Sequence, residues 1–102
     1  MWAPAYATNL RDIIMKYPIA IEQGDDEFAY GVIFPDLEGC FSAGDTYEEA
    51  ISNAQEALEL YIEPFKESGT KLPLASQIND HKDKPEFKGY AWSTVETKGS
   101  QT

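Results

Sequence analysis

The fold is decided by residues 44–65, GDTYEEAISNAQEALELYIEPF, where a helix start signal precedes a long helical pattern. Thr46 with Glu49 three residues later has the spacing of a capping box. Apolar residues then recur at helical spacing, at positions 50, 51, 54, 57, 58, 61, 62 and 65. This pattern predicts one long helix with an apolar face turned to a sheet, bent or stopped near Pro64 and capped by Gly69.

The segments before this helix have the composition of β-strands. Residues 17–22 alternate around two isoleucines, and residues 28–34 are rich in aromatic and β-branched side chains. The Gln-Gly-Asp-Asp turn between them predicts an antiparallel hairpin. Pro18 indicates a strand start or an edge position, because proline has no N–H to donate. A turn over 35–39 then leads to a short third strand over 40–43.

The last third of the chain is less regular. Residues 72–76 are predicted to be extended and apolar, and residues 79–88 form a polar loop. Residues 89–97 alternate as a last strand, and residues 98–102 form a flexible tail.

The order of these elements predicts an α+β fold with the succession β-β-β-α-β. We expect an antiparallel sheet of three to four strands with the long helix packed on one face. At the N-terminus, residues 9–15 form either a short helix or the run into the first strand. One domain over residues 1–102 is expected, with its core at about 15–97.

The charge of the chain is concentrated in its centre. The 102 residues hold 18 acidic and 8 basic side chains, a formal net charge of -10. Residues 17–65 contain twelve of the acids and no Lys or Arg. Such a block is either a solvated surface or a surface for a basic partner. It argues against binding of nucleic acid by this chain.

Composition also bears on location. No apolar run approaches the roughly 20 residues needed to cross a bilayer. The N-terminus lacks the basic and long apolar regions of a secretory signal. Cys40 is the single cysteine, which excludes an internal disulfide and favours the reducing cytoplasm.

Few residues suggest catalysis. His81 is the only histidine and is interpreted as a solvated loop residue, and Cys40 as a small buried hydrophobe. Asp36, Glu38 and Asp45 flank a short strand, so a metal-dependent nuclease remains an alternative. Zinc-ligand spacing and a phosphate-cradling glycine run are absent from the sequence, and no cofactor is expected. Six aromatic residues fall at core spacing: Tyr17, Phe28, Tyr30, Phe34, Tyr61 and Phe65.

Four motifs then carry a family resemblance: YPIAIE at 17–22, YGVIFPDLEGC at 30–40, AGDT at 43–46 and EEAI at 48–51. In this combination they resemble the HicB family, the antitoxins of type II toxin–antitoxin pairs, over about residues 17–75. The resemblance implies a partial ribonuclease H fold without catalytic carboxylates, and therefore no enzyme. It also implies a partner, a HicA-like toxin that is a basic mRNA endonuclease with an active-site histidine, whose activity binding would block.

The sequence departs from many family members at its end. Those members carry a further C-terminal DNA-binding domain, whereas only seven residues follow Val95 here. Operator binding is therefore not transferred to this chain.

The motif residues fall into two predicted groups. Structural positions in the turn and helix start are Pro35, Gly39, Gly44, Asp45, Thr46, Glu49 and Ala50. Predicted partner contacts are acids in turns: Asp25, Asp26, Glu27, Asp36 and Glu38. Exposed strand edges also predict a homodimer or tetramer, and an oligomeric module without a toxin is a third hypothesis.

Overall fold

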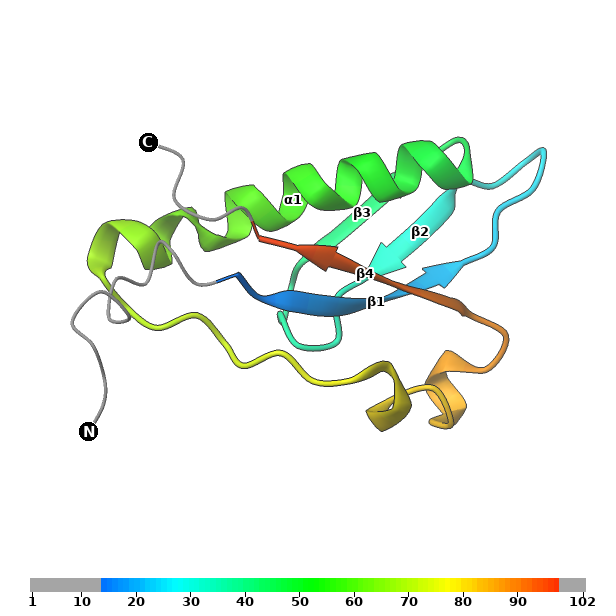
Figure 1. Ribbon diagram of the computed structural model, residues 1–102. Coiled ribbons are helices and arrows are strands. Elements are labelled where there is room, and N and C mark those ends of the chain that lie inside the picture. The colour runs from blue at the N-terminus through cyan, green and yellow to red at the C-terminus, as the bar shows by residue number, and fades with distance from the viewer. Residues whose placement is uncertain (1–13, 98–102) are drawn as a thin grey trace.

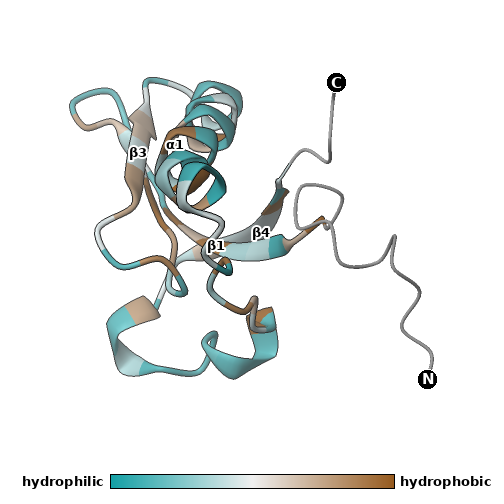
Figure 2. Cartoon of the chain, turned by 90° about the vertical axis from the view of Figure 1, so that its left-hand side faces the viewer, coloured by the Kyte–Doolittle hydropathy of each residue, from teal (hydrophilic) through white to brown (hydrophobic). Residues whose placement is uncertain are grey.

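The computed structural model describes residues 14–97, which form one sheet, one long helix and two short 3-10 turns. The elements in chain order are β1 (Lys16–Glu22), β2 (Tyr30–Ile33), β3 (Phe41–Gly44), α1 (Tyr47–Ser68), η3 (Ile78–Asp80), η4 (Pro85–Phe87) and β4 (Ala91–Glu96). The strand order is β3-β2-β1-β4, and every neighbouring pair is antiparallel. Helix α1 lies on one face of the sheet and the two turns lie on the other (Figures 1 and 2). The predicted α+β architecture is confirmed.

The core lies between α1 and the face of the sheet that it covers. Ala50, Ala54, Leu58 and Ile62 recur every four residues along α1, and each is 0% exposed. They pack against fully buried strand residues that include Tyr17, Ile19, Ile21 and Val32. The predicted apolar stripe therefore faces the sheet because a four-residue repeat keeps it on one side of the helix.

The start of α1 follows the predicted capping signal with one difference. Thr46 is the N-cap, and its Oγ1 accepts a hydrogen bond from Glu49 N at 3.0 Å. The Glu49 side chain reaches back to the Asp45 N–H, at 2.6 Å, one residue earlier than the usual capping box. Two backbone donors at the helix start are thereby satisfied.

The end of α1 corrects one expectation. Pro64 lies inside the helix and does not stop it, since α1 continues to Ser68. The helix ends where predicted at Gly69, which has a φ of 74° and donates its N–H to Lys66 O. Because this left-handed conformation suits glycine, the C-cap rather than the proline terminates the helix.

The N-terminal half of the sheet shows two further differences. Strand β2 begins at Tyr30 instead of Phe28, because Asp25 Oδ1 accepts the backbone N–H groups of Glu27 and Phe28 at 2.7 and 2.9 Å. Pro18 lies in the central strand β1, so the edge interpretation was wrong. It does lie near the strand start, where β1 pairs with β4 before its pairing with β2 begins at Ala20.

The remaining expectations concern the ends of the chain and membranes. The helix considered for residues 9–15 and the tail at 98–102 lie almost entirely outside the described residues. Within residues 14–97, no helix has the length and apolar character to span a bilayer.

Candidate functional site

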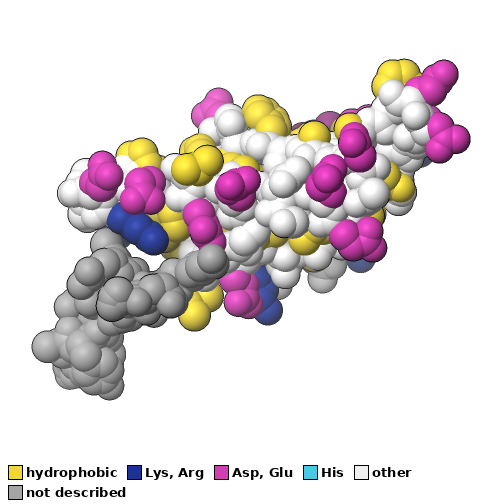
Figure 3. Space-filling model, turned by 90° about the horizontal axis from the view of Figure 1, so that it is seen from above, with side chains coloured by type: hydrophobic (Ala, Val, Ile, Leu, Met, Phe, Trp, Pro, Cys, Tyr) yellow, Lys and Arg dark blue, Asp and Glu magenta, His cyan; other side chains and the backbone are white. Residues whose placement is uncertain are grey.

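Acidic side chains form a continuous row along the outer side of α1. Glu49, Glu56, Glu63 and Glu67 are exposed and separated by seven, seven and four residues, close to whole helical turns. They lie opposite the buried stripe, together with Leu60, which is 71% exposed. We call these five residues the acidic helix face. Figure 3 looks down on α1 and shows acidic side chains along its length, with basic side chains at the margins.

A second acidic surface is the loop between β1 and β2, residues 23–29, here called the finger loop. It projects beyond the start of α1 (Figure 1). Asp25 organises it, because its carboxylate accepts two backbone N–H groups and its own N–H donates to Phe28 O at 2.9 Å. Asp26 and Glu27 are exposed beside it. Of the three acids predicted here, Asp26 and Glu27 point their charge at solvent and Asp25 also holds the loop.

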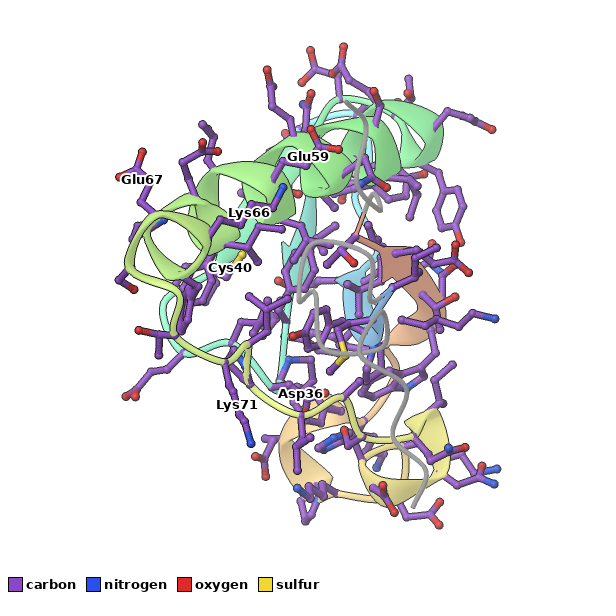
Figure 4. All side chains as sticks on the ribbon, turned by 60° about the vertical axis from the view of Figure 1, so that its left-hand side comes forward. Asp36, Cys40, Glu59, Lys66, Glu67 and Lys71 are labelled. Atoms are coloured by element: carbon purple, nitrogen blue, oxygen red, sulfur yellow. The ribbon has the colours of Figure 1, made fainter. Side chains whose placement is uncertain are left out.

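The other two predicted partner contacts, Asp36 and Glu38, both lie in the turn after β2 but differ in exposure. Glu38 is exposed, and its backbone carbonyl accepts a hydrogen bond from the Tyr61 hydroxyl at 3.1 Å. The Asp36 side chain is only 11% exposed, and both of its oxygens are hydrogen-bonded to Ser76. Figure 4 shows Asp36 away from α1, toward the segment that follows the helix, whereas Cys40 lies close to the helix.

Asp36 belongs to a polar cluster that sequence reasoning missed. Ser76 Oγ lies 2.7 Å from Asp36 Oδ1 and 2.6 Å from His81 Nε2. Lys84 Nζ lies 3.2 Å from His81 Nδ1, and the His81 ring stacks on Trp92. The interpretation of His81 as a solvated residue was wrong, because the side chain is buried. Local sequence carried no signal for this, since Asp36 and Ser76 are forty positions apart.

The cluster has the residue types of a hydrolase triad but the wrong hydrogen bonds. Lys84 is a donor only, so Nδ1 of His81 must accept and Nε2 of the neutral ring carries the proton. That proton points to Ser76 Oγ, whose own proton goes to Asp36. In a triad the histidine accepts the serine proton. The cluster therefore acts as a structural link between the turn after β2 and the η3–η4 segment.

The carboxylates of the nuclease alternative do not come together. Asp36 and Glu38 follow β2, whereas Asp45 follows β3, so they occupy opposite ends of an antiparallel pair. Among residues 14–97 there is no group of three or more His, Cys, Asp or Glu side chains arranged to hold a metal. Cys40 is buried, and burial raises the pKa of its thiol, which disfavours the reactive thiolate.

Tyr17 gives a pH-dependent test of the core. Its buried hydroxyl donates to Pro73 O at 2.6 Å, and burial, with Asp36 and Tyr61 nearby, raises its pKa to about 12. An unfolded tyrosine titrates near pH 10, so the folded chain keeps this proton to higher pH. The contribution of this group to stability is intact below pH 10 and is lost as the pH rises through 12, with a loss of about 2 kcal/mol at pH 12.

Urea unfolding of the wild type and of Tyr17→Phe between pH 7 and pH 12 measures this effect. At pH 7 the variant is expected to lose about 1 kcal/mol with the hydrogen bond. Above pH 10 its stability should fall less steeply than that of the wild type. Parallel alkaline slopes for the two proteins would show that Tyr17 does not titrate in this range.

The fold and its charged surface define a class: a small α+β domain that presents an acidic helix, an arrangement suited to binding a basic macromolecule. The chain belongs to the HicB-like antitoxins of bacterial toxin–antitoxin systems, whose family model matches residues 17–102.

Individual relatives agree with this assignment. A 14.9 kDa protein from the rep-hol intergenic region of Haemophilus phage HP1 is 43% identical over 82 residues, covering 80% of this chain and 60% of that protein. Antitoxin HicB 1 of Photorhabdus laumondii is 38% identical over 72 residues, covering 70% of this chain and 46% of the relative. This chain therefore spans about half to three-fifths of the length of these two proteins.

Solved structures share the fold. The N-terminal domain of Burkholderia pseudomallei antitoxin HicB matches with a TM-score of 0.68 and 34% identity, over 79% of this chain and 95% of that one. A chain of the HicA3–HicB3 toxin–antitoxin complex matches with a TM-score of 0.62 and 30% identity, over 85% of this chain and 100% of that one. The predicted HicB resemblance is confirmed.

Proposed function

We propose that this chain is an antitoxin that binds a HicA-type mRNA endonuclease and blocks it by covering its basic RNA-binding surface. The observation that carries the proposal is the acidic helix face on a HicB-like fold. A structural relative is described as part of a complex of HicA3 with HicB3. A toxin that cleaves mRNA needs a basic surface to hold the phosphate backbone, and such a surface would have the opposite charge to the acidic helix face. The chain itself acts without catalysis or nucleic-acid binding, in the cytoplasm where mRNA is translated.

The toxin contacts the acidic helix face and the exposed acids beside it. Asp26 and Glu27 on the finger loop and Glu38 in the turn extend the negative surface beyond α1. Asp36 is left out of this contact set because its carboxylate is nearly buried and bonded to Ser76. Opposite charges speed the encounter and orient the two proteins, an effect that weakens as salt rises.

Charge complementarity is supplemented by an apolar centre. Leu60 is exposed in the middle of the acidic helix face, with Glu56 and Glu63 on neighbouring turns. Interfaces gain most of their affinity from a few desolvated side chains surrounded by a polar rim. Because α1 is anchored by four fully buried residues, the helix backbone is in place before binding, and only the exposed side chains have to be ordered on association.

The decisive experiment uses a HicA-type protein, sought first in the reading frame next to that of this chain. The two proteins are co-expressed, purified through a tag on the toxin, and assayed for cleavage of a labelled mRNA. We expect stoichiometric co-purification at 150 mM NaCl, loss of cleavage at equimolar antitoxin, and release of the complex at high salt. Lack of binding at low salt, or unimpaired cleavage by the complex, would refute the proposal.

A further inference from the structure

The finger loop carries Phe28, the most exposed aromatic side chain within residues 14–97, at 68% exposure. Its spacing in the sequence predicted a core position, and that prediction was wrong. A single exposed apolar residue is ordinary on a protein surface and needs no explanation. Phe28 differs from such a residue because its backbone is held by hydrogen bonds and because acidic side chains flank it.

The backbone of Phe28 is held by Asp25 on both sides of its peptide unit. The Phe28 N–H donates to Asp25 Oδ1 at 2.9 Å, and the Phe28 carbonyl accepts the N–H of Asp25 at 2.9 Å. At the base of the loop, a Cβ on Gly24 would lie 2.6 Å from Phe28 O and 2.7 Å from Tyr30 N, so the two arms of the loop meet backbone to backbone. These contacts place the Phe28 backbone before a partner binds, which leaves mainly the ring to be ordered on association.

Acidic side chains from two elements lie around this part of the molecule. Asp26 and Glu27 directly precede Phe28 and are exposed, and no cation within residues 14–97 forms an ion pair with either of them. Tyr30, at the end of the loop, packs edge-to-face on Tyr47 at 6.4 Å, which brings the acidic first turn of α1 beside the loop. Figure 3 shows hydrophobic and acidic side chains together at the projecting tip.

An aromatic ring flanked by unpaired carboxylates fits a protein surface with an apolar pocket and basic residues around its rim. The ring leaves water inside the pocket, while the carboxylates meet positive charge at the edge, which is the arrangement of residues that carry binding energy in protein interfaces. Nucleic acid or an anionic bilayer would repel the same carboxylates. The acidic helix face also requires a basic partner, so one protein can contact both surfaces.

The finger loop is a separate contact from the centre of the acidic helix face. Tyr47 and Leu60 are thirteen residues apart in α1, about 20 Å along the helix axis. The finger loop projects beyond the Tyr47 end of the helix (Figure 1). A partner that buries about 800 Å² on this chain covers a patch roughly 30 Å across, which is wide enough to include both Leu60 and Phe28.

From this geometry we infer that Phe28 is a second apolar anchor of the toxin complex. Its ring fills an apolar pocket on the HicA-type toxin, and Asp26 and Glu27 pair with basic residues at the rim of this pocket. The inference rests on the proposed function, since the partner is the same toxin, and it assigns different roles to two parts of the surface. The acidic helix face speeds the encounter, whereas Phe28 prolongs the life of the complex.

Surface plasmon resonance against the toxin tests this by comparing Phe28→Ala with Phe41→Ala. Phe41 is a matched control at 62% exposure, and it lies on the sheet face away from α1, because the next residue, Ser42, donates to Ala50 O. Phe28→Ala should raise the dissociation rate about thirtyfold and leave the association rate and its salt dependence unchanged. Phe41→Ala should keep both rates within about twofold of the wild type.

Two variants at Asp25 separate the placement of the loop from its charge. Asp25→Asn keeps a side-chain oxygen that accepts the two N–H groups, whereas Asp25→Ala removes it. Asp25→Asn should bind the toxin within about threefold of the wild type, and Asp25→Ala about tenfold more weakly, because the loop must then be ordered on binding. Circular dichroism checks that each variant is folded.

The outcomes distinguish this inference from the proposed function. An unchanged dissociation rate for Phe28→Ala, or equal effects of Phe28→Ala and Phe41→Ala, would overturn the role of Phe28 and leave the antitoxin role intact. Failure of the wild-type chain to bind the toxin would refute both.

Discussion

Substituting Gly44 by alanine is expected to destabilise the protein by about 3 kcal/mol, which lowers the melting temperature by roughly 10–20 °C. The added Cβ would lie 2.4 Å from Ala50 N and 2.7 Å from Glu49 C, both backbone atoms of the first turns of α1. Backbone cannot yield as a flexible side chain does. The helix start would have to move away from β3, which would disturb the packing of the buried stripe that begins at Ala50.

Gly31 provides the matched control for this substitution. It lies in β2 on the opposite face, where a Cβ would meet nothing closer than Glu22 Oε1 at 3.8 Å. Gly31→Ala should leave the stability unchanged or raise it by up to about 1 kcal/mol, because alanine restricts the unfolded chain. Thermal unfolding by circular dichroism measures both variants. Similar melting temperatures for the two variants would show that Gly44 does not lie against the backbone of α1.

The second large effect is expected on toxin binding, when two charges on the acidic helix face are reversed. Glu56→Lys combined with Glu63→Lys should weaken toxin binding about a hundredfold or more, because it places like charges across an interface that relies on opposite ones. Both side chains are exposed and lie opposite the buried stripe, so the fold should be retained. Titration calorimetry or surface plasmon resonance against the HicA-type toxin gives the dissociation constants.

A second reversal with the same change of net charge separates position from total charge. Asp83→Lys combined with Glu86→Lys changes two exposed acids near η4, on the other side of the sheet. This variant should bind within about threefold of the wild type. Equal losses for the two pairs would mean that the net charge, rather than the acidic helix face, controls binding. The double variant Asp26→Lys with Glu27→Lys then measures how much the finger loop contributes to the affinity for the toxin.

Features that depend on neighbours in sequence were predicted well. The cap at Thr46, the end at Gly69 and the buried stripe follow from helix geometry, which depends on residues three or four positions apart. The β1–β2 hairpin follows from the turn chemistry around Gly24. Two local predictions were wrong. Phe28 lies outside β2 because its N–H donates to the Asp25 side chain, and Pro64 lies within the last turns of α1 without ending the helix.

The candidate site was predicted only in part. The block of acids without Lys or Arg was visible in the sequence, and helical spacing could have placed Glu56, Glu63 and Leu60 on one side. The predicted contacts instead fell on turns. One of them, Asp36, is nearly buried because Ser76, which follows the whole of α1 in the chain, folds back against it.

Local sequence therefore specifies the helix, its caps, the turns and the sign of the charge, since each depends on short-range backbone and side-chain geometry. Long-range packing specifies which surfaces those elements expose. Long-range packing buries His81 against Trp92, hydrogen-bonds the Asp36 carboxylate to Ser76 and leaves Phe41 exposed to solvent. These outcomes depend on strand order and register, which are set by contacts between residues far apart in the chain. The composition shows that the chain is acidic, but the tertiary structure decides where the acids lie: one row of them is exposed along the outer side of α1, and the sheet separates that row from the η3–η4 segment.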